Sequence, residues 1–501
     1  MSHVREPRVS VIIPVYNAMP YLTATLRSVL AQDLAEIEVV AVNDGSTDGS
    51  GAELDRFAQR DHRLVVVHQP NSGWPGAPRN RGIERARGDY LFFMDADDTM
   101  APHALHDMVR MAEARAADIV IPRLEGTGGR RVQSLFRRHP AGEMSIARAM
   151  ETLSPQKLFS RALIERAGLR FPEERVRLED GIFVARAYTR ASRILLCGAG
   201  PLYFIALRDD GQNISSRAID PVNYVASCRR IAAILSEGTP DPTAAQRLVL
   251  QFFQRKGLRF YAPHRWGRMS LPTRETWVTL HREFLRDFAP PAGDARIAHP
   301  TDRRKLALIR AGDVVGLTAL IAAEPECAHA ARVVEARGTE RGTELTLAAV
   351  PSVARGRLVR GIPGPARQRA VRRLDRVARA FGGSRAARGL NRRVAAGLTS
   401  GAPRVWLILG CRRRDRTVAL AGRLVGYDPD AGALSYAFVL SPELLRGFGN
   451  DRVDLWTVAG TADGASGARV RLSASERLDA AGAAEHLYAT AHGNASLRAA
   501  G

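Results

Sequence analysis

Residues 9–15 read Val-Ser-Val-Ile-Ile-Pro-Val, a short run in which nearly every side chain is apolar. Four comparable runs begin at Ile37, Leu64, Tyr90 and Asp118, so that successive runs start 26 to 28 residues apart. Short, continuous runs rich in β-branched residues are typical of strands that are buried on both faces of a sheet. The first 125 residues or so therefore indicate one regular series of buried strands.

The segments between these runs have a helical pattern. After the first run, the apolar residues Leu22, Leu26, Val29 and Leu30 recur at the spacing of one helix face. Strands that alternate with helices predict an α/β fold with a mostly parallel, helix-covered sheet. Ligands of such sheets bind beyond the carboxyl ends of the strands, so we expect the functional residues directly after the apolar runs.

The pattern changes twice further along the chain. Residues 219–324 have mainly helical patterns, and from about residue 331 short alternating segments such as Arg404–Gly410 predict strands. We therefore predict an α/β domain over residues 1–218, a helical linker domain over 219–328 and a β-sandwich-like region over 329–501.

The chain carries a net charge of +21, and arginine supplies nearly all of it because only three lysines occur. Residues 351–400 hold thirteen arginines and one acidic residue, Asp375, so +12 of the +21 lies in this segment. For this segment we predict a phosphate-rich acceptor polymer or an anionic membrane surface as the partner, and we expect no nucleic acid. The alternatives are an ordinary solvated face and the codon bias of a GC-rich genome.

The four cysteines are Cys197, Cys228, Cys327 and Cys411, and their wide separation excludes the common zinc-ligand spacings. Free cysteines are typical of a reducing compartment. The first ten residues lack the apolar core of a signal peptide, and no run of ~20 apolar residues occurs. We therefore expect a cytoplasmic protein, with attachment to the inner face of the membrane as the second location.

Three carboxylates follow the fourth apolar run, at Asp95, Asp97 and Asp98. At the exit of a buried strand they would repel one another without a cation. Mg²⁺ or Mn²⁺ takes one or two carboxylates together with phosphate oxygens, so this pattern favours a metal site for a diphosphate. The alternative is a solvated acidic loop, or a helix N-terminus near Pro102 that Asp98 caps.

The motifs at the strand exits occur in a characteristic order: SVIIPVYN (10–17), VNDGSTD (42–48), an N-x-G…RN-x-G segment (71–82) and DADD (95–98). This set resembles family 2 glycosyltransferases, which have the GT-A fold. The resemblance implies that the following residues bind a UDP-sugar: Pro14, Tyr16, Asp44, Asn71, Arg79, Asp95, Ala96 and Asp97. It further implies that Asp44 accepts a hydrogen bond from uracil, that Arg79 holds the diphosphate region and that Asp97 and Asp95 ligate Mn²⁺ or Mg²⁺.

A second acidic pair, Glu179-Asp180, precedes the apolar helical residues 182–185. The dipole of a helix stabilises acidic side chains at its N-terminus, and this stabilisation is the simpler interpretation of the pair. In inverting enzymes of the resembled family, such a pair supplies the catalytic base. By that resemblance Asp180 deprotonates the acceptor hydroxyl in a single inverting displacement.

Arg123 and Arg208 each follow a strand-like run and are weaker candidates for binding the diphosphate of the donor. The alternative is that both are exposed surface arginines.

The segment from Asn71 to Asn80 is one residue longer than the common family spacing and has Pro78 directly before the arginine. This departure is similar to the wall teichoic acid glycosyltransferases that attach N-acetylglucosamine to poly(ribitol phosphate). That subgroup implies an anionic polymer acceptor and a β-rich region that assembles a homotrimer.

Other classes of protein explain parts of the pattern. A nucleotidyltransferase would need a glycine-rich signature after its first strand, and residues 11–20 contain no glycine. A nucleic-acid-binding protein would explain the charge but not the ordered acidic motifs. Two further interpretations stay open: a glycosyltransferase of a capsular or exopolysaccharide pathway, and a polyanion-binding protein with an inactive GT-A domain.

The carboxyl-terminal region contains four aromatic residues that could stack on sugars: Trp406, Tyr427, Tyr436 and Trp456. Core packing explains these residues more simply.

Overall fold

The computed structural model describes residues 6–130, 132, 135–198, 200–207, 219–352, 358, 369, 402–411, 416–428, 431–472, 487–490 and 492–498. The chain divides into two compact units, Met1–Phe252 and Phe253–Gly501. Of the arginine-rich segment 351–400, nearly all lies outside the described residues, and so does Arg208.

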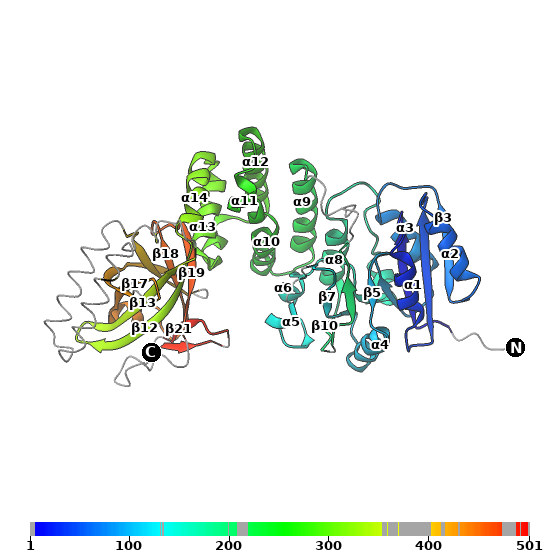
Figure 1. Ribbon diagram of the computed structural model, residues 1–501, viewed down its shortest axis with the longest axis horizontal. Helices are drawn as coiled ribbons and strands as arrows, with labels where there is room; N and C mark the ends of the chain where they lie inside the picture. The colour runs from blue at the N-terminus through cyan, green and yellow to red at the C-terminus, as the bar shows by residue number, and fades with distance from the viewer. Residues whose placement is uncertain are drawn as a thin grey trace. The chain divides into compact units, whose positions relative to one another are not determined.

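The first unit, coloured blue to green in Figure 1, is built on a sheet with the strand order β3-β2-β1-β4-β9-β6-β10-β8 among the described residues. These strands are β1 (Val9–Val15), β2 (Ile37–Asp44), β3 (Leu64–Gln69), β4 (Tyr90–Phe93), β6 (Ile119–Ile121), β8 (Gly142–Glu143), β9 (Leu158–Ser160) and β10 (Ile194–Leu196). Strand β1 runs parallel to β2 and β4, whereas β9 is antiparallel to β4 and β6. The α/β fold predicted from the apolar runs is confirmed.

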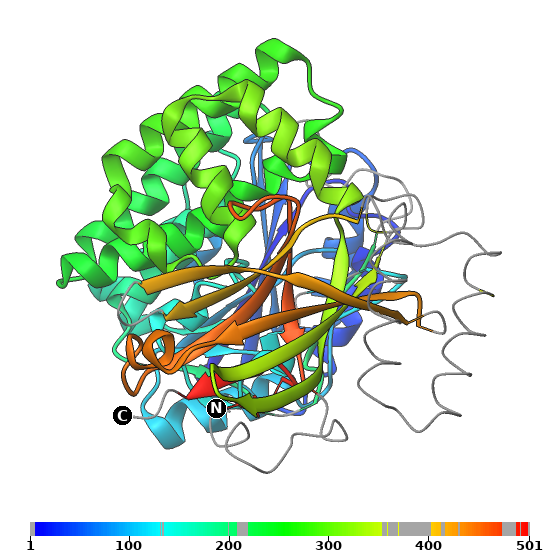
Figure 2. The same cartoon turned by 90° about the vertical axis from the view of Figure 1, so that its left-hand side faces the viewer.

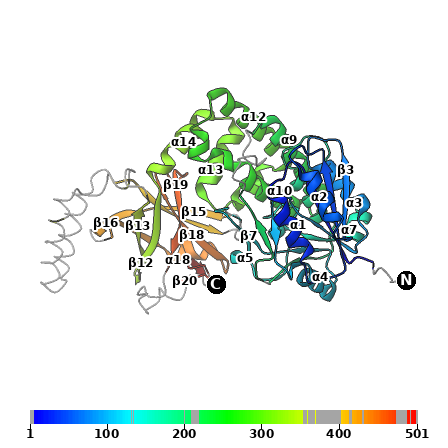
Figure 3. The same ribbon diagram turned by 45° about the vertical axis from the view of Figure 1, so that its right-hand side comes forward.

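Helices cover both faces of this sheet, which explains why its strands are apolar throughout (Figure 3). The helices of the first unit are α1 (Leu22–Leu30), α2 (Ser50–Ala58), α3 (Gly76–Arg85), α4 (Ala104–Arg115), α5 (Leu135–Arg138), α6 (Ile146–Ala149), α7 (Arg161–Arg166), α8 (Glu179–Arg190), α9 (Pro221–Glu237) and most of α10 (Pro242–Lys256). Helices α1, α2 and α4 share one core with Val11 and Ile13. Helix α3 lies against the other face, where a Cβ on Gly82 would come within 2.3 Å of Ile12.

Aromatic packing fixes α8 against the same face as α3. The rings of Phe171 and Phe183 stack with centroids 3.9 Å apart, and Phe93 of β4 meets both edge-on. Phe159 of β9 meets Phe183 at 5.6 Å. Because Phe183 lies one turn after the start of α8, this cluster sets the position of the acidic pair at that helix end.

A small second sheet in the first unit has the order β5-β11-β7, from strands β5 (Thr99–Met100), β11 (Tyr203–Ile205) and β7 (Leu124–Gly126). It places Tyr203 directly behind the acidic run that follows β4, because the backbone N–H of Asp95 donates to Tyr203 Oη at 3.1 Å.

The helices of the second unit pack around buried aromatic residues. They are the 3₁₀ helices η2 (Leu258–Tyr261) and η3 (Pro291–Arg296), with α11 (Pro263–Trp266), α12 (Leu271–Phe288), α13 (Pro300–Ala311) and α14 (Val314–Glu326). His281 is 1% exposed, its Nδ1 lies 2.9 Å from Tyr261 Oη, and its ring lies 5.2 Å from that of Trp277. Burial lowers the pKa of His281 to about 3. No helix among the described residues is long and apolar enough to cross a membrane.

The rest of the second unit is rich in strands (Figure 2). They are β12 (His329–Thr339), β13 (Gly342–Pro351), β14 (Val405–Cys411), β15 (Arg416–Ala421), β16 (Arg423–Asp428), β17 (Ala433–Leu440), β18 (Arg452–Ala459), β19 (Ser466–Arg471), β20 (Leu487–Ala489) and β21 (Ala495–Arg498), with the short helix α18 (Pro442–Arg446). A short parallel pairing of β12 with β19 joins two antiparallel halves into one sheet of the described strands. The predicted β-rich character of this region is confirmed.

Tyr436 and Phe438 belong to the core between these strands, whereas Trp406 and Trp456 are half-buried. Arg469 lies 5.3 Å from the Trp456 ring, and His299 meets that ring edge-on. The aromatic residues of this region therefore take part mainly in packing.

Candidate active site

A single buried arginine joins the two acidic motifs. Arg79 lies on α3, and its side chain is 5% exposed. Its Nη1 donates to Asp180 Oδ1 at 2.7 Å, and its Nη2 donates to Asp95 Oδ1 at 3.1 Å. Burial alone would lower the pKa of Arg79, but the charges of Asp180 and Asp95 outweigh it and raise that pKa above its ordinary value. The guanidinium is therefore a permanent cation held between the end of β4 and the start of α8.

Asp180 lies in the first turn of α8 and keeps about a third of its side chain exposed. Its neighbour Glu179 is buried, and burial followed by the charge of Asp180 raises the pKa of Glu179 to about 8. The burial of Glu179 therefore favours its neutral form, and Asp180 is the carboxylate of the pair that solvent and a substrate can reach.

The Asp95 carboxylate is held from two sides. Oδ1 accepts from Arg79, and Oδ2 accepts from Gln156 Nε2 at 2.7 Å. Each carboxylate oxygen has a further lone pair for a ligand. Asp95 is 37% exposed, so a ligand can reach it.

Asp98 differs from the other two carboxylates of the motif. It is 3% exposed, its Oδ1 accepts from the Ala206 N–H at 2.9 Å, and its own carbonyl accepts from Thr25. Burial, and then the charges of Asp95 and Asp97, raise the pKa of Asp98 to about 8. Helix α4 has His103 at its N-cap, so Asp98 does not cap it, and that alternative interpretation of the motif is wrong.

The acidic run fits a divalent cation only in part. Among the residues that the structure describes, no group of three or more His, Cys, Asp or Glu side chains forms a complete metal cage. Asp97 is half-buried and Asp95 has lone pairs left, so each of these two carboxylates could supply an oxygen, and phosphate oxygens could complete the coordination. That number suits Mg²⁺ or Mn²⁺ bound together with a diphosphate.

The end of β2 forms a second polar cluster. The Asp44 carboxylate accepts from Gln69 Nε2, from the Ser72 N–H and from Ser72 Oγ at 2.7–3.0 Å. Asn71 Nδ2 donates to the Asp44 carbonyl at 2.9 Å. Asp44 is 4% exposed, and its orientation is therefore fixed by the loop that follows β3.

The remaining predicted residues vary in exposure. Tyr16 is 52% exposed beyond β1, and Pro14 is half-buried within that strand. Ala96 is buried, and its carbonyl accepts from Thr25 at 2.9 Å. Arg123 is exposed, and its carbonyl accepts from the backbone of β11. Tyr16 thus has the exposure that stacking on a base requires.

Sequence patterns did not reveal Gln156 or Tyr203, which both bond to Asp95. Gln156 precedes the short strand β9, and Tyr203 is the first residue of β11 in the small second sheet. Neither residue belongs to a recognisable motif, and only the tertiary fold brings them to the carboxylate.

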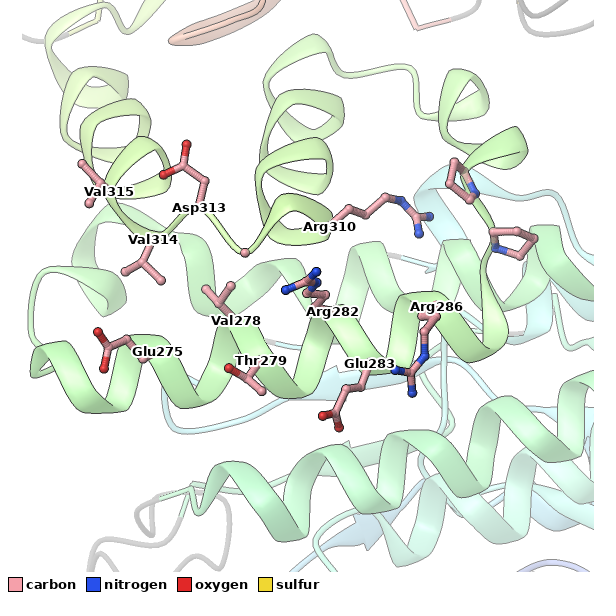
Figure 4. Close-up of a pocket in the computed structure, with 13 residues that line it drawn as sticks. Glu275, Val278, Thr279, Arg282, Glu283, Arg286, Arg310, Asp313, Val314 and Val315 are labelled. Carbon is pink, nitrogen blue, oxygen red and sulfur yellow. The ribbon is translucent and has the colours of Figure 1, made fainter.

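A pocket of about 950 Å³ in the second unit contains none of the predicted site residues (Figure 4). It lies between α12 and the turn from α13 to α14, and side chains of both charges line it, among them Arg282, Glu283 and Asp313. Asp313 caps α14 through the Gly316 N–H at 2.7 Å, and Arg310 binds Asp294 through two nitrogens. Asp313 and Arg310 therefore have structural roles in this pocket.

Residues 10–170 match the family model described as Glycosyl transferase family 2. The chain contains a family 2 glycosyltransferase domain. Residues 221–321 match the model described as Glycosyl transferase TarS linker domain. The resemblance predicted from the ordered motifs is confirmed, and so is the helical linker as part of the fold.

The chain is homologous to poly(ribitol-phosphate) glycosyltransferases. Poly(ribitol-phosphate) beta-N-acetylglucosaminyltransferase TarS of Staphylococcus aureus is 32% identical over 251 residues, which are 49% of this chain and 44% of that protein. Poly(ribitol-phosphate) beta-glucosyltransferase of Bacillus spizizenii is 28% identical over 317 residues, 62% of this chain and 50% of that protein. The matched part of the chain spans about half the length of these relatives.

Two crystal structures of S. aureus TarS are similar to this structure. TarS 1-349 in complex with UDP-GlcNAc has a TM-score of 0.57 at 27% identity and covers 63% of this chain and 90% of that chain. A second TarS structure has a TM-score of 0.60 at 18% identity and covers 98% of this chain and 85% of that chain, which shows a shared fold.

Proposed function

We propose that this chain is an inverting glycosyltransferase that moves a sugar from a UDP-sugar to a hydroxyl of a polyol-phosphate polymer. The observation that carries the proposal is the shared guanidinium of Arg79. It donates to the proposed donor-side carboxylate, Asp95, and to Asp180, so that these two carboxylates lie on either side of one guanidinium group. A base and a donor site must be this close if one displacement joins the acceptor oxygen to the anomeric carbon.

Asp180 is the proposed general base. It accepts the proton of the acceptor hydroxyl as the new glycosidic bond forms and the bond to the UDP oxygen breaks. Its exposure and its place at a helix N-terminus, where the dipole favours a carboxylate, support this role. Burial raises the pKa of Glu179, which favours Asp180 as the charged member of the pair.

The nucleotide is proposed to bind at the strand exits. Asp44, oriented by Ser72 and Gln69, would accept from the uracil N–H, and Tyr16 would stack on the base. Asn71 fixes the loop that orients Asp44. Arg79 and Arg123 would face the diphosphate, and Ala96 would line the donor site beside Asp95.

Asp97 and Asp95 would hold Mn²⁺ or Mg²⁺. When bound, such a cation neutralises the charge that develops on the departing diphosphate. Arg79 contributes a fixed positive charge to the same region without any metal.

The relatives support N-acetylglucosamine as the favoured sugar, and glucose is the second candidate, because one relative is a beta-N-acetylglucosaminyltransferase and the other a beta-glucosyltransferase. An anionic polymer acceptor fits the net charge of +21. We further propose domain boundaries at residues 218 and 328, a homotrimer assembled by the β-rich region, and a cytoplasmic location beside the inner membrane face.

The decisive experiment measures UDP release from a panel of UDP-sugars, with and without Mn²⁺ and with poly(ribitol phosphate) or poly(glycerol phosphate) as acceptor. Acceptor-dependent UDP release from UDP-N-acetylglucosamine supports the proposal. Absence of turnover with every donor and acceptor, together with retained UDP binding, would indicate an inactive domain.

A further inference from the structure

Gln156 is a buried glutamine at the edge of the candidate active site. Its side chain is 4% exposed, and its Nε2 donates to Asp95 Oδ2 at 2.7 Å. Only this orientation of the amide gives the carboxylate a donor, because the opposite orientation would place two oxygens against each other. The amide therefore acts on Asp95 as a hydrogen-bond donor.

Contacts to α8 hold the loop that carries Gln156. Tyr188 Oη donates to the Thr152 carbonyl at 3.0 Å. The buried Lys157 donates to the Ser154 carbonyl, and its Nζ lies 6.0 Å from the centroid of the Tyr188 ring. Tyr188 lies on the helix that begins with Asp180, so the loop and the proposed base share one rigid support.

The four side chains form a continuous line of hydrogen bonds. Gln156 donates to one oxygen of Asp95, Arg79 donates to the other, and the second nitrogen of Arg79 donates to Asp180. A carboxylate held at both oxygens cannot rotate about its last bond without losing a donor. The direction of its remaining lone pairs is then fixed before any ligand arrives.

The amide costs stability in a way that an apolar side chain would not. Among the described residues, Gln156 Oε1 is buried and has no hydrogen-bond partner. A buried, unpaired carbonyl oxygen costs about 1–3 kcal/mol. Leucine has a similar size and would avoid that cost, so packing alone does not explain a glutamine at this position.

We propose that Gln156 is a positioning residue of the donor site, which acts through Asp95 and Arg79. It orients Asp95 toward the UDP-sugar and keeps Arg79 shared between Asp95 and Asp180. The inference rests on the proposed function, because it assigns the residue to the donor site of that reaction.

The test compares the full-length chain with Gln156→Leu, Gln156→Glu and Gln156→Asn. Leucine keeps the volume, glutamate keeps the shape but brings an acceptor against Asp95, and asparagine keeps the amide on a side chain one methylene shorter. The readouts are UDP affinity by calorimetry, donor KM, kcat and thermal unfolding. The matched control is Gln32→Leu, because Gln32 is also buried but its side chain, among the described residues, bonds only to backbone atoms of Ser28, Ala101 and Leu105.

We expect Gln156→Leu and Gln156→Glu to weaken UDP binding and to reduce kcat/KM by ~10–100-fold, as removal of an outer partner of a binding carboxylate does. Gln156→Asn should lie between these variants and wild type. Gln32→Leu should lower thermal stability and leave UDP affinity and donor KM unchanged.

If Gln156→Leu and Gln156→Glu change the melting temperature but neither UDP affinity nor kcat/KM, the residue is structural and the inference is wrong. If wild type turns over no UDP-sugar, the proposed transferase activity fails instead. In that case the UDP affinities of the same variants still decide whether Gln156 positions Asp95.

Discussion

Nη1 of Arg79 lies 2.7 Å from Oδ1 of Asp180, although the two residues are 101 positions apart in the chain. If Asp180 is the base, as proposed, this ion pair favours its charged form, and the second ion pair of Arg79 with Asp95 connects it to the proposed donor site. Binding a diphosphate beside Arg79 would draw on the same guanidinium, so donor binding and the strength of the base are linked through one side chain.

Arg79→Lys should reduce kcat/KM by at least ~100-fold. An ammonium cannot donate in a fixed fork to Asp95 and Asp180 at once. The control is Arg81→Lys, because Arg81 lies two residues further on the same helix and is exposed. Steady-state kinetics with UDP-sugar and acceptor measure the effect, and equal activity of the two variants would contradict the assigned role.

Asp180→Asn should reduce kcat by ~10²–10⁴-fold, the usual contribution of general-base catalysis, while UDP affinity changes little. Asp89→Asn is the control, because Asp89 is exposed and lies before β4. NMR of the product reports the configuration at the transferred anomeric carbon. Retention of the donor's configuration would exclude a single displacement with Asp180 as its base.

Asp97→Asn should abolish metal-dependent turnover and leave the fold intact, because Asp97 is half-buried and follows β4 rather than packing in the core. Chelation of divalent cations with EDTA should inactivate wild type, and Mn²⁺ or Mg²⁺ should restore it. The exposed Asp33→Asn serves as control. Undiminished wild-type activity in EDTA would remove the metal from the proposal.

His281 should make the second unit less stable in acid. Its pKa is about 3 in the folded chain and ~6.5 when unfolded, so the unfolded state binds the proton first. The stabilisation is complete above pH ~6.5 and is lost as the pH falls toward 3, by about 2 kcal/mol between pH 7 and pH 5. Urea unfolding at pH 7, 6 and 5 should show a shallower loss in His281→Gln than in wild type. If the free energy of unfolding falls equally with pH in the two proteins, the acid sensitivity belongs to other groups.

The full-length chain should have three times the mass of one chain in light scattering at micromolar concentration. The expectation follows from the subgroup of teichoic acid glycosyltransferases that the sequence resembles. A mass of one or two chains over a tenfold range of concentration would be incompatible with a stable trimer.

The sequence predicts the main strands of the first unit because local periodicity encodes them. Val9–Val15 and Ile37–Asp44 are buried on both faces, and such strands leave an apolar run. No sequence pattern marks strand β9, because its three residues, Leu158–Ser160, are too few to show a period, and their antiparallel pairing with β4 depends on the finished sheet.

The site divides along the same line. Asp95, Asp97 and Asp180 were predicted because short motifs at strand and helix ends carry them. The hydrogen bonds of Asp95 with Arg79, Gln156 and Tyr203 join residues that are 16, 61 and 108 positions apart in the chain. No local sequence pattern can therefore predict these bonds. The sequence therefore indicates which functional side chains the chain contains, and tertiary packing decides which of them form hydrogen bonds and ion pairs with one another.

The parallel pairing of β12 with β19 has a consequence for synthesis of the chain. Ala331 pairs with Val470, which leaves the ribosome 139 residues later. At ~5–20 residues per second, one edge of β12 stays open for ~7–28 s after its own synthesis. During that time its unpaired backbone can meet the strands of neighbouring nascent chains. Slower translation of residues 340–470 should therefore increase aggregation of this protein, and a chaperone that covers strand edges should reduce it.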